Sequence, residues 1–338
     1  MHYLYVLTSS TNDFYYEQFL LSITSLKLKM PDAETTLLCD SKTAETLTGK
    51  RTEYEKLISN IVSAEPPYLM SQIEVSRWLK TSMRRLVKGD FLFIDCDTIV
   101  TDNLSSIKEL GIEFGACLDR HSLINFHDKK NFIIKNDNRL GFSSYLLNKH
   151  YNSGVIFCAD TPAIHNFFER WHDYWLFSKK NNILRDQPAF NMAISENHSL
   201  VAELDGTWNC QVAFNGLQFL EKSKIIHCFI SDTFLAASPF MLSSEDLLKN
   251  IKKSGRITDD AFELLKNPRS AFSPQSRILS GSEMIYVINS DFFQFIIFLK
   301  KKIPFLFRFF NFLCSLFKRV IKSKFIKSSR KKGAVIYN

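Results

Sequence analysis

Two carboxylates separated by one residue follow an apolar run in this chain. The run is Phe91-Leu92-Phe93-Ile94, and Asp95 and Asp97 come directly after it. Alternate residues of an extended chain point to the same side, so both carboxylates should face one crevice. At ~5 Å and an effective dielectric of about 20 they repel by roughly 3 kcal/mol, which a bound divalent cation would reverse. Carboxylate oxygens suit Mg²⁺ or Mn²⁺ together with a phosphate-bearing ligand, whereas the alternative is a solvated turn after a strand.

The elements around this pair predict an α/β fold. Four large apolar residues in a row are typical of a strand buried on both faces, in the centre of a mostly parallel sheet covered by helices. Helical patterns follow the first two of the other predicted strands, which indicates parallel pairing. The other predicted strands cover Tyr3–Leu7, Thr35–Cys39, Phe114–Leu118 and Tyr151–Cys158. Ligands of such sheets bind beyond the carboxyl ends of the strands, where Asp95 and Asp97 stand.

Polar residues at two other element ends are candidates for the same crevice. The loop at residues 8–13 joins a strand to a helix, and such a turn makes a plausible phosphate or nucleotide edge. Ser71 and Glu74 form the pattern of a capping box, which begins the helix that leads into the Asp95 strand. Arg77 lies beside the apolar face of this helix, so it either reaches the crevice or is solvated.

Three later positions carry polar side chains that could converge there. Asn152-Ser153-Gly154 opens a strand, and the glycine suggests close approach by a ligand or another strand. Asp186 and Gln187 begin a helix near the positive end of its dipole, although Asp186 could also be an ordinary N-cap. His227 ends a short apolar run, where a core histidine is the alternative. The long polar stretch at residues 120–150 is a candidate binding lid.

Composition locates the charge at the end of the chain. Of the 338 residues, 45% are hydrophobic and 31 are phenylalanine, and the net charge is +8. Residues 300–338 hold 12 Lys or Arg and no Asp or Glu, so residues 1–299 carry 31 basic and 35 acidic residues, a balance of −4. The basic pI therefore gives no support to a nucleic-acid groove in the body, and no nucleic-acid partner is expected.

The cysteines and the first residues indicate a reducing compartment. Seven cysteines show no C-x-x-C spacing, and several lie inside apolar runs, which predicts buried free thiols. Residues 1–7 lack a basic region before their apolar residues, so we expect a first strand and no signal peptide.

Aromatic and basic residues alternate in blocks from residue 285 onward. No apolar run there approaches the ~18 residues that span a bilayer. The mixture of Phe, Leu, Lys and Arg fits segments that lie in a membrane interface, with the basic residues facing anionic head groups. A partner-protein helix or a nucleic-acid arm is the alternative. We therefore expect a main domain at residues 1–270, a linker at 271–284 and a basic amphipathic tail at 285–338.

Residues 1 to about 230 resemble glycosyltransferase family 8, which includes glycogenin and bacterial lipopolysaccharide galactosyl- and glucosyltransferases. The motifs occur in the order of the family. They are the turn Thr11-Asn12-Asp13-Phe14-Tyr15, the basic residue Arg77, Asp95-Cys96-Asp97, Asn152-Ser153-Gly154-Val155, Asp186-Gln187 with Asn191, Trp208-Asn209, and His227. The resemblance implies a GT-A fold, a UDP-sugar donor, Mn²⁺ or Mg²⁺, and transfer with retention of anomeric configuration.

The same resemblance assigns a role to each candidate residue. Metal ligands would be Asp95, Asp97 and His227. Donor-binding residues would be Thr8, Thr11, Asn12, Tyr15, Arg77, Asp95 and Cys96, and catalytic residues would be Gln187, Asp186, Asn152 and Arg77. Gln187 would lie on the β-face of the sugar, as a weak nucleophile or as a stabiliser of an oxocarbenium-like transition state.

One departure from the family pattern follows His227. The family continues with an aromatic, a glycine and a Lys-Pro-Trp, whereas this chain continues Cys228-Phe229-Ile230-Ser231-Asp232-Thr233, without the lysine that contacts the diphosphate. The leading hypothesis is a hexosyltransferase on the inner face of the cytoplasmic membrane, with a lipid-linked or cell-envelope glycan as acceptor, as in lipopolysaccharide synthesis. A non-catalytic nucleotide-sugar or membrane-surface binding module and a nucleotidyltransferase are the alternatives.

Overall fold

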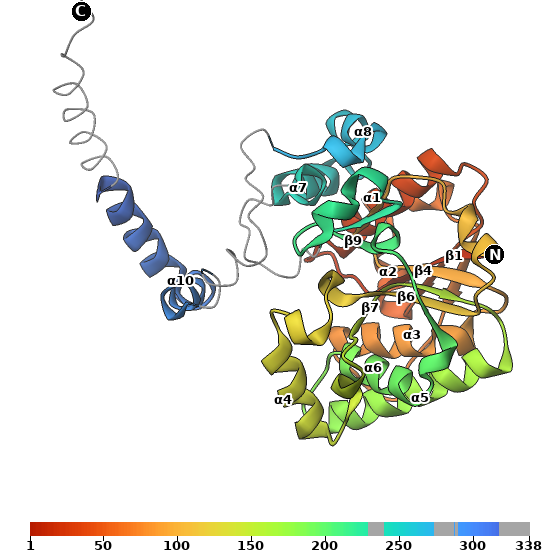
Figure 1. Cartoon of the computed structure of the whole chain (residues 1–338). Coiled ribbons are helices and arrows are strands. Elements are labelled where there is room, and N and C mark those ends of the chain that lie inside the picture. Colours follow the sequence, from red (N-terminus) through yellow and green to blue (C-terminus); the bar gives the residue numbers. More distant parts are fainter. Residues whose placement is uncertain (229–239, 274–286, 288–289, 318–338) are drawn as a thin grey trace, which may run out of the picture. The chain divides into compact units, whose positions relative to one another are not determined.

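The chain forms two compact units. A computed structural model describes residues 1–228, 240–273, 287 and 290–317 (Figure 1). The first unit is Met1–Ile278 and the second is Leu279–Asn338, and each is described by itself.

A seven-stranded sheet in the order β3-β2-β1-β4-β7-β6-β8 forms the centre of the first unit. Its strands are β1 (His2–Leu7), β2 (Thr35–Cys39), β3 (Asn60–Ser63), β4 (Phe91–Ile94), β6 (Phe114–Leu118), β7 (Tyr151–Cys158) and β8 (Val201–Glu203). All pairs are parallel except those of β7, which runs antiparallel to both β4 and β6. The predicted α/β fold with a mostly parallel sheet is confirmed. We call the edge at which β1, β4 and β6 end, and at which β7 begins, the crevice edge.

A second, three-stranded sheet was not predicted from the sequence. It has the order β5-β10-β9, formed by β5 (Thr98–Val100), β10 (Ile225–His227) and β9 (Cys210–Gln211). β10 pairs antiparallel with β5, so that His227 stands opposite Thr98. The Cys228 N–H donates to the Asp97 carbonyl over 2.9 Å. This small sheet therefore carries His227 to the end of the Asp95–Asp97 turn.

Helices cover both faces of the large sheet (Figure 1). On one face α3 (Gln72–Leu86), α5 (Pro162–Lys180) and α6 (Gln187–Glu196) form a core with a buried aromatic stripe that includes Trp171 and Trp175. On the other face lie α1 (Tyr15–Lys29), α7 (Glu245–Ser254), α8 (Asp259–Lys266) and the small sheet. The short helix α2 (Ser41–Thr46) follows β2, and Asp40 caps it through the Thr43 N–H.

The predicted capping box sets the start of α3. The Glu74 N–H donates to the Ser71 hydroxyl, and the Glu74 carboxylate accepts from the Ser71 N–H over 2.8 Å. Because α3 leads directly into β4 and runs back along it, its first turn lies at the crevice edge. Arg77 and the rest of the first two turns are thereby held beside the end of β4.

Residues 120–150 contain more regular structure than expected of a lid. The helix α4 (Lys130–Leu140) lies within them, flanked by short 3₁₀ turns. Leu140 and Phe142 are buried and pack with Ile183. Apolar periodicity did not predict α4, because most of its side chains are polar. Only Ile133, Asp137 and Leu140 of this helix are buried.

The cysteines are free, as predicted, but not all are buried. Four are buried, whereas Cys96 and Cys228 are partly buried and Cys314 is exposed. Cys314 lies in the second unit, within the helix at residues 304–317, so the expected burial is wrong for it.

The second unit is helical where it is described. α10 (Asp291–Lys302) begins with a Ser290 cap, and residues 304–317 form a further helix. Phenylalanine side chains on both helices are exposed, among them Phe292, Phe295, Phe305 and Phe317. No described helix is long and apolar enough to cross a membrane. Most of the predicted linker, residues 274–284, and residues 318–338 of the predicted tail lie outside the described residues.

Candidate active site

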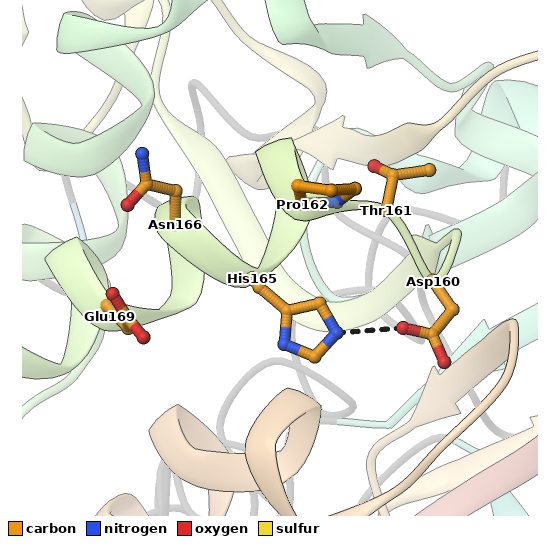
Figure 2. Close-up of a pocket in the computed structure, with 6 residues that line it drawn as sticks. All are labelled: Asp160, Thr161, Pro162, His165, Asn166 and Glu169. Carbon is orange, nitrogen blue, oxygen red and sulfur yellow. Dashed lines mark hydrogen bonds and ion pairs between the residues drawn. The ribbon is translucent and has the colours of Figure 1, made fainter.

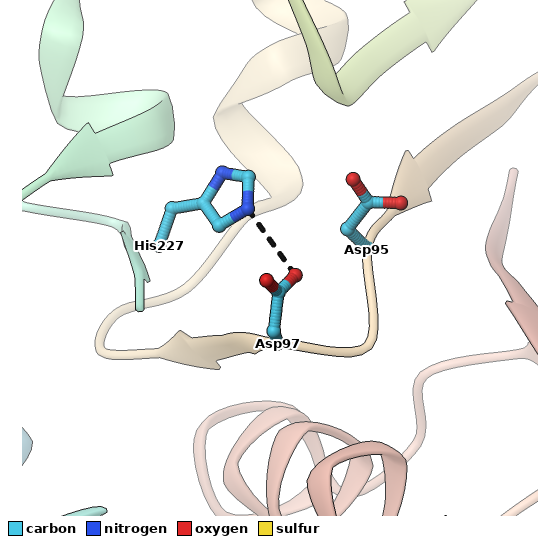
Figure 3. Close-up of side chains that lie close together, drawn as sticks. All are labelled: Asp95, Asp97 and His227. Carbon is cyan, nitrogen blue, oxygen red and sulfur yellow. Dashed lines mark ion pairs between the residues drawn. The ribbon is translucent and has the colours of Figure 1, made fainter. Parts of the chain in front are cut away.

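Asp95, Asp97 and His227 converge at the crevice edge (Figure 3). One potential ligand atom from each of the three residues lies within 4.8 Å of the others. Asp95 follows β4, Asp97 precedes β5, and His227 ends β10, so the two sheets each contribute to the group. The His227 Nε2 is 3.2 Å from the Asp97 Oδ1. Two carboxylates and an imidazole at this spacing are a donor set that suits a divalent cation.

A chain of hydrogen bonds fixes which nitrogen of His227 faces the carboxylates. The Gly154 N–H donates to Asn152 Oδ1 (2.9 Å), and Asn152 Nδ2 donates to Asp119 Oδ1 (2.9 Å), so the Asn152 amide has one possible orientation. Asn209 Nδ2 donates to the same Asn152 oxygen over 2.9 Å. The Asn209 oxygen therefore faces the His227 Nδ1 at 2.9 Å and accepts its proton. The His227 Nε2 is left directed at Asp97, as metal coordination requires.

Gly154 makes room for the imidazole. A Cβ at this position would lie 2.3 Å from the His227 Cε1 and 2.9 Å from its Nδ1. The close approach predicted at this glycine is made by the His227 side chain. The start of β7 thus supports His227, through the Gly154 Cα and the Asn152 amide.

Lys80 lies between two carboxylates and was missed by the sequence analysis. Its Nζ is 3.1 Å from the Asp95 Oδ2 and 3.8 Å from the Asp186 Oδ2, and its side chain is buried. It stands three residues after Arg77 on α3, which places both cations on one face of the helix. The three-residue spacing from Arg77 was the signal in the sequence from which Lys80 could have been predicted. A lysine inside an amphipathic helix nevertheless usually marks the solvated face.

Arg77 reaches the crevice, which settles the alternatives stated for it. Its Nε is 3.2 Å from the Asp186 Oδ1, and 34% of its side chain is exposed. Burial disfavours the charged guanidinium, but the carboxylates of Asp186, Asp95 and Asp97 outweigh this and raise the pKa of Arg77. The guanidinium therefore stays charged at the mouth of the carboxylate cluster.

Asp186 is not an ordinary N-cap. It precedes α6, but its side chain makes no capping hydrogen bond. Ser153 donates to its Oδ2 over 2.9 Å, and the ion pairs with Arg77 and Lys80 complete its surroundings. Burial would raise the pKa of Asp186, but Lys80 and Arg77 outweigh it and lower the pKa, so the group is ionised.

Gln187 and Asn191 both contact Tyr151 at the start of β7. The Gln187 Nε2 donates to the Tyr151 carbonyl over 3.3 Å, and the Gln187 side chain is partly exposed. Asn191 pairs with the N–H and the carbonyl of Tyr151, over 2.6 Å and 3.0 Å. Asn191 therefore fastens α6 to β7, and Gln187 is left nearer the crevice.

The predicted nucleotide turn is held by Asp13. Its carboxylate accepts from the Ser9 hydroxyl (2.7 Å), the Ser10 N–H (2.7 Å) and the Tyr15 N–H (3.1 Å). The predicted donor residues of this turn differ in exposure: Thr8 is buried, whereas Thr11, Asn12 and Tyr15 are exposed. Cys96, the remaining predicted donor residue, points its thiol toward the Val6 carbonyl over 3.3 Å, so the site can use only its backbone.

Burial and mutual proximity shift the pKa values of Asp95, Asp97 and His227, which we call the triad. Burial and the nearby Asp97 raise the pKa of Asp95, against the opposing effect of Lys80. Burial would also raise the pKa of Asp97, but the imidazole of His227 outweighs it and lowers the pKa. Burial lowers the pKa of His227, yet the Asp97 carboxylate more than compensates, so the pKa is raised. With Asp186 beside them, Asp95 and Asp97 belong to a cluster of three carboxylates and two basic side chains, Arg77 and Lys80.

A second buried cluster, also missed, stands behind Asn152. Asp119 accepts from Asn152 on one oxygen, and its other oxygen is 3.1 Å from the His127 Nε2. The His127 Nδ1 is 3.2 Å from Asp128, which in turn pairs with Arg120. Since no spacing in the sequence groups these residues, the folded chain was needed to reveal them. The cluster holds Asp119, and through it the Asn152 amide, in place.

A surface pocket elsewhere is not part of this site. Figure 2 shows its lining at the start of α5, where the His165 Nε2 is 2.7 Å from the Asp160 Oδ1. Asp160 follows the end of β7, and Cys158 of β7 pairs with Phe91 at the start of β4. The pocket therefore lies at the edge of the sheet opposite to the crevice edge. Residues 229–233, where the chain departs from the family pattern, lie outside the described residues.

Known proteins support the predicted family. Residues 83–231 match the family model described as glycosyl transferase family 8. Among solved structures, the galactosyltransferase LgtC in complex with donor and acceptor sugar analogs has 12% sequence identity and a TM-score of 0.50, covering 78% of this chain and 99% of LgtC. Mouse xyloside xylosyltransferase 1 in its apo form has 15% identity and a TM-score of 0.45, covering 67% and 97%. The WbbM bifunctional glycosyltransferase has 14% identity and a TM-score of 0.48, covering 79% and 52%.

No curated protein sequence matches the chain. At 12% identity, the likeness to LgtC establishes the shared fold, and the family model adds the sequence evidence over the segment that contains Asp95, Asp97 and His227. Residues 83–231 of this chain are therefore a glycosyltransferase family 8 region, and the resemblance predicted from the sequence is confirmed.

Proposed function

We propose that this protein is a metal-dependent, retaining hexosyltransferase that uses a UDP-sugar and acts on a lipid-linked or cell-envelope glycan of the lipopolysaccharide type. The observation that carries the proposal is the convergence of Asp95, Asp97 and His227 at the crevice edge, beside the partly exposed Arg77 and the buried Lys80. The general activity, glycosyl transfer, agrees with the family match. The donor, the metal, the stereochemistry and the acceptor are the proposed parts.

The triad fits a divalent cation. Two oxygens and one imidazole nitrogen are close enough to share an ion, and the Asn209 contact keeps the His227 Nε2 available to it. Mn²⁺ or Mg²⁺ bound there would neutralise charge that develops on a departing diphosphate. The turn at residues 8–15 would receive the nucleotide, with Thr8, Thr11, Asn12 and Tyr15 around it, and the backbone at Cys96 would lie beside it.

Arg77 supplies a cation for the diphosphate where the family lysine is absent. Residues 228–248 contain no Lys or Arg in the sequence. Among the described residues, Asp186 is the only group within ion-pair distance of Arg77, so the guanidinium can still bind an anion. A bidentate contact from arginine to phosphate oxygens is strong and directional. Lys80, which is buried between Asp95 and Asp186, positions these carboxylates instead.

Residues at the starts of β7 and α6 are placed for the sugar. The oxygens of Asp186 are engaged by Arg77, Lys80 and Ser153, which makes this carboxylate a poor nucleophile and a good hydroxyl acceptor. Within the described residues, Gln187 bonds through its Nε2 alone, and its amide oxygen can face the anomeric carbon. The buried Asn152 amide already bonds to Gly154, Asn209 and Asp119, so it would hold a sugar hydroxyl only through its second Nδ2 hydrogen. These roles apply equally to double displacement and to departure and attack on the same face.

The tail accounts for the proposed membrane association. Residues 300–338 carry 12 basic and no acidic residues, and exposed phenylalanines accompany them on α10 and on residues 304–317. At about 1 kcal/mol per basic residue near an anionic surface, half of these charges would hold the protein on the inner face of the cytoplasmic membrane. Deleting residues 285–338 should weaken binding to anionic vesicles while donor hydrolysis continues. Loss of hydrolysis in a truncated protein whose urea unfolding midpoint is unchanged would contradict this separation of roles.

UDP release tests the proposed reaction. The intact chain would be incubated with Mn²⁺ and each of a panel of UDP-hexoses, beside the variant Asp97→Ala and the exposed-surface control Asp246→Ala. The expected result is release of UDP from one sugar by the intact chain and by Asp246→Ala. Loss of this release on chelation and in Asp97→Ala would establish both the activity and the donor. Metal-dependent UDP binding without turnover, even with added acceptor glycolipid, would favour a non-catalytic binding module. Release of pyrophosphate from a nucleoside triphosphate would indicate a nucleotidyltransferase.

A further inference from the structure

The most exposed large apolar side chains of the first unit border the crevice. Among its described residues, the four highest exposed fractions belong to Leu69 (90%), Phe126 (81%), Leu146 (72%) and Ile73 (58%). We call these four residues the rim. Apolar side chains scattered singly over a surface are ordinary, whereas a group of them around a binding site marks an interaction surface.

Leu69 and Ile73 form one half of the rim. Leu69 precedes α3 and Ile73 lies in its first turn, which is at the crevice edge. Gln72 stands between them, and its Nε2 donates to the Thr8 carbonyl (3.2 Å) and to Asp13 Oδ2 (2.9 Å). This half of the rim is therefore fixed to the predicted nucleotide turn.

Phe126 and Leu146 form the other half. Phe126 lies in the turns that follow β6, and Leu146 lies in the turn that precedes β7, so both stand at the crevice edge. The Ile124 N–H donates to the Asn148 carbonyl (3.0 Å), and the Asn125 N–H donates to Asn148 Oδ1 (2.9 Å). The two turns are thus joined, with α4 between them in sequence. Figure 1 shows α4 on the side of the sheet that faces away from the N-terminus. Because β1 begins beside the N-terminus, it ends on the side where α4 lies.

The segment that carries Phe126 and Leu146 is basic, whereas the body of the protein is acidic. Residues 120–150 hold six Lys or Arg and two Asp, a net charge of +4 against −4 for residues 1–299 as a whole. Both acidic groups are engaged within the segment: Asp128 pairs with Arg120, and the buried Asp137 accepts from Ser144. The charge that this segment presents outward is therefore positive, and it accompanies exposed apolar side chains. This combination is complementary to a lipid surface with anionic head groups.

We propose that the rim docks the crevice edge onto an anionic membrane surface, with Phe126 and Leu146 inserted at the boundary between head groups and acyl chains. This contact is separate from the tail, and the two would reinforce one another because both belong to one chain. The docking rests on exposure and charge alone. Its consequence, that the crevice opens toward an acceptor anchored in the membrane, rests on the function proposed above.

Tryptophan insertion with brominated lipids tests the contact directly. The four native tryptophans are all buried, with at most 5% of the residue exposed, so quenching by bromine reports mainly on an added indole. The full-length variants Phe126→Trp, Leu146→Trp and Leu69→Trp would be mixed with vesicles of brominated phosphatidylcholine and phosphatidylglycerol. Leu28→Trp is the matched control, since Leu28 is exposed near the end of α1, at the opposite edge of the sheet. No donor or acceptor is present, so the result does not depend on glycosyl transfer.

We expect the rim tryptophans to be quenched and Leu28→Trp to remain unchanged. In parallel, Phe126→Ser and Leu146→Ser should each lower partition into anionic vesicles on the order of tenfold, and Leu28→Ser should not. Equal quenching at position 28 and at the rim would overturn the proposal, because the tail alone would then account for binding. Unchanged vesicle partition, with a shift from dimer to monomer in the serine variants by sedimentation, would also overturn it and assign the rim to a second copy of this chain.

Discussion

Replacing Asn209 with leucine tests whether the hydrogen-bond chain below the triad prepares His227 for a metal. Asn209 is fully buried, and its oxygen accepts from the His227 Nδ1 while its amide donates to Asn152. Asn209→Leu keeps the approximate volume but removes the acceptor, so nothing at this position retains the proton on Nδ1. Partners that orient a ligating histidine are typically worth 10- to 100-fold in metal affinity, or about 1.4 to 2.7 kcal/mol. We expect Mn²⁺ to bind Asn209→Leu weaker by this factor.

Asn209→Asp is the matched variant, because a carboxylate still accepts from Nδ1. Its Mn²⁺ affinity should stay within about threefold of the wild type, although both variants lose the bond to Asn152, at about 1–3 kcal/mol of unfolding free energy. Affinity would be measured from the electron paramagnetic resonance signal of free Mn²⁺ without donor, and unfolding by urea. Equal affinities of Asn209→Leu and wild type, or an Asn209→Asp variant as weak as Asn209→Leu, would refute the reasoning.

Three further predictions concern other parts of the site. Gly154→Ala should weaken Mn²⁺ binding by more than about tenfold, because its Cβ would lie 2.3 Å from the His227 ring. Gly141→Ala is the control: its Cβ meets nothing within 4 Å, so it should lose stability through its positive φ and keep its metal affinity. Lys80→Met should lower the free energy of unfolding by about 3 kcal/mol, since the largely buried Asp186 and the neighbouring Asp95 lose a shared cation. Added Mn²⁺ should restore part of the lost stability. A urea midpoint like that of the wild type would contradict this prediction. Burial lowers the pKa of His150 from 6.5 to about 4, so the unfolded chain binds a proton that the folded chain rejects, and this group should contribute a loss of about 3 kcal/mol of stability as the pH drops from 6.5 to 4. His150→Gln should remove that contribution, while His121 and His172, whose pKa values burial also lowers to about 4, keep theirs; an unaltered pH profile would rule His150 out.

The sequence predicted the parts of the site that obey a local rule. Alternation along an extended chain placed Asp95 and Asp97 on one side, and the capping box placed the start of α3. Both are confirmed by the contacts of the folded chain. The proximity of His227 to the two carboxylates came from the family resemblance, because no property of the isolated run Ile225-Ile226-His227 identifies its partners.

Residues whose environment is created by distant segments were not predicted. Lys80 has the sequence signature of a solvated helix position, and its burial depends on Asp95 and Asp186 closing over it. The strands β5, β9 and β10 are two or three residues long, too short for a periodicity, and β10 pairs with β5 across more than a hundred residues. Asp119 became recognisable through its bond to Asn152, which joins two strands of the sheet. The roles of all these residues in binding or catalysis stay predictions.

The division of the three candidate metal ligands between two sheets has a consequence for synthesis of the protein. Asp95 and Asp97 leave the ribosome early, but the imidazole that completes the group arrives with the last strand of the small sheet, β10. A nascent chain that ends before residue 227 would present a repelling carboxylate pair and no complete coordination sphere. Manganese uptake would thus begin only after most of the first unit has been translated. A series of stalled nascent chains of increasing length would show metal-dependent protection from proteolysis appearing in one step.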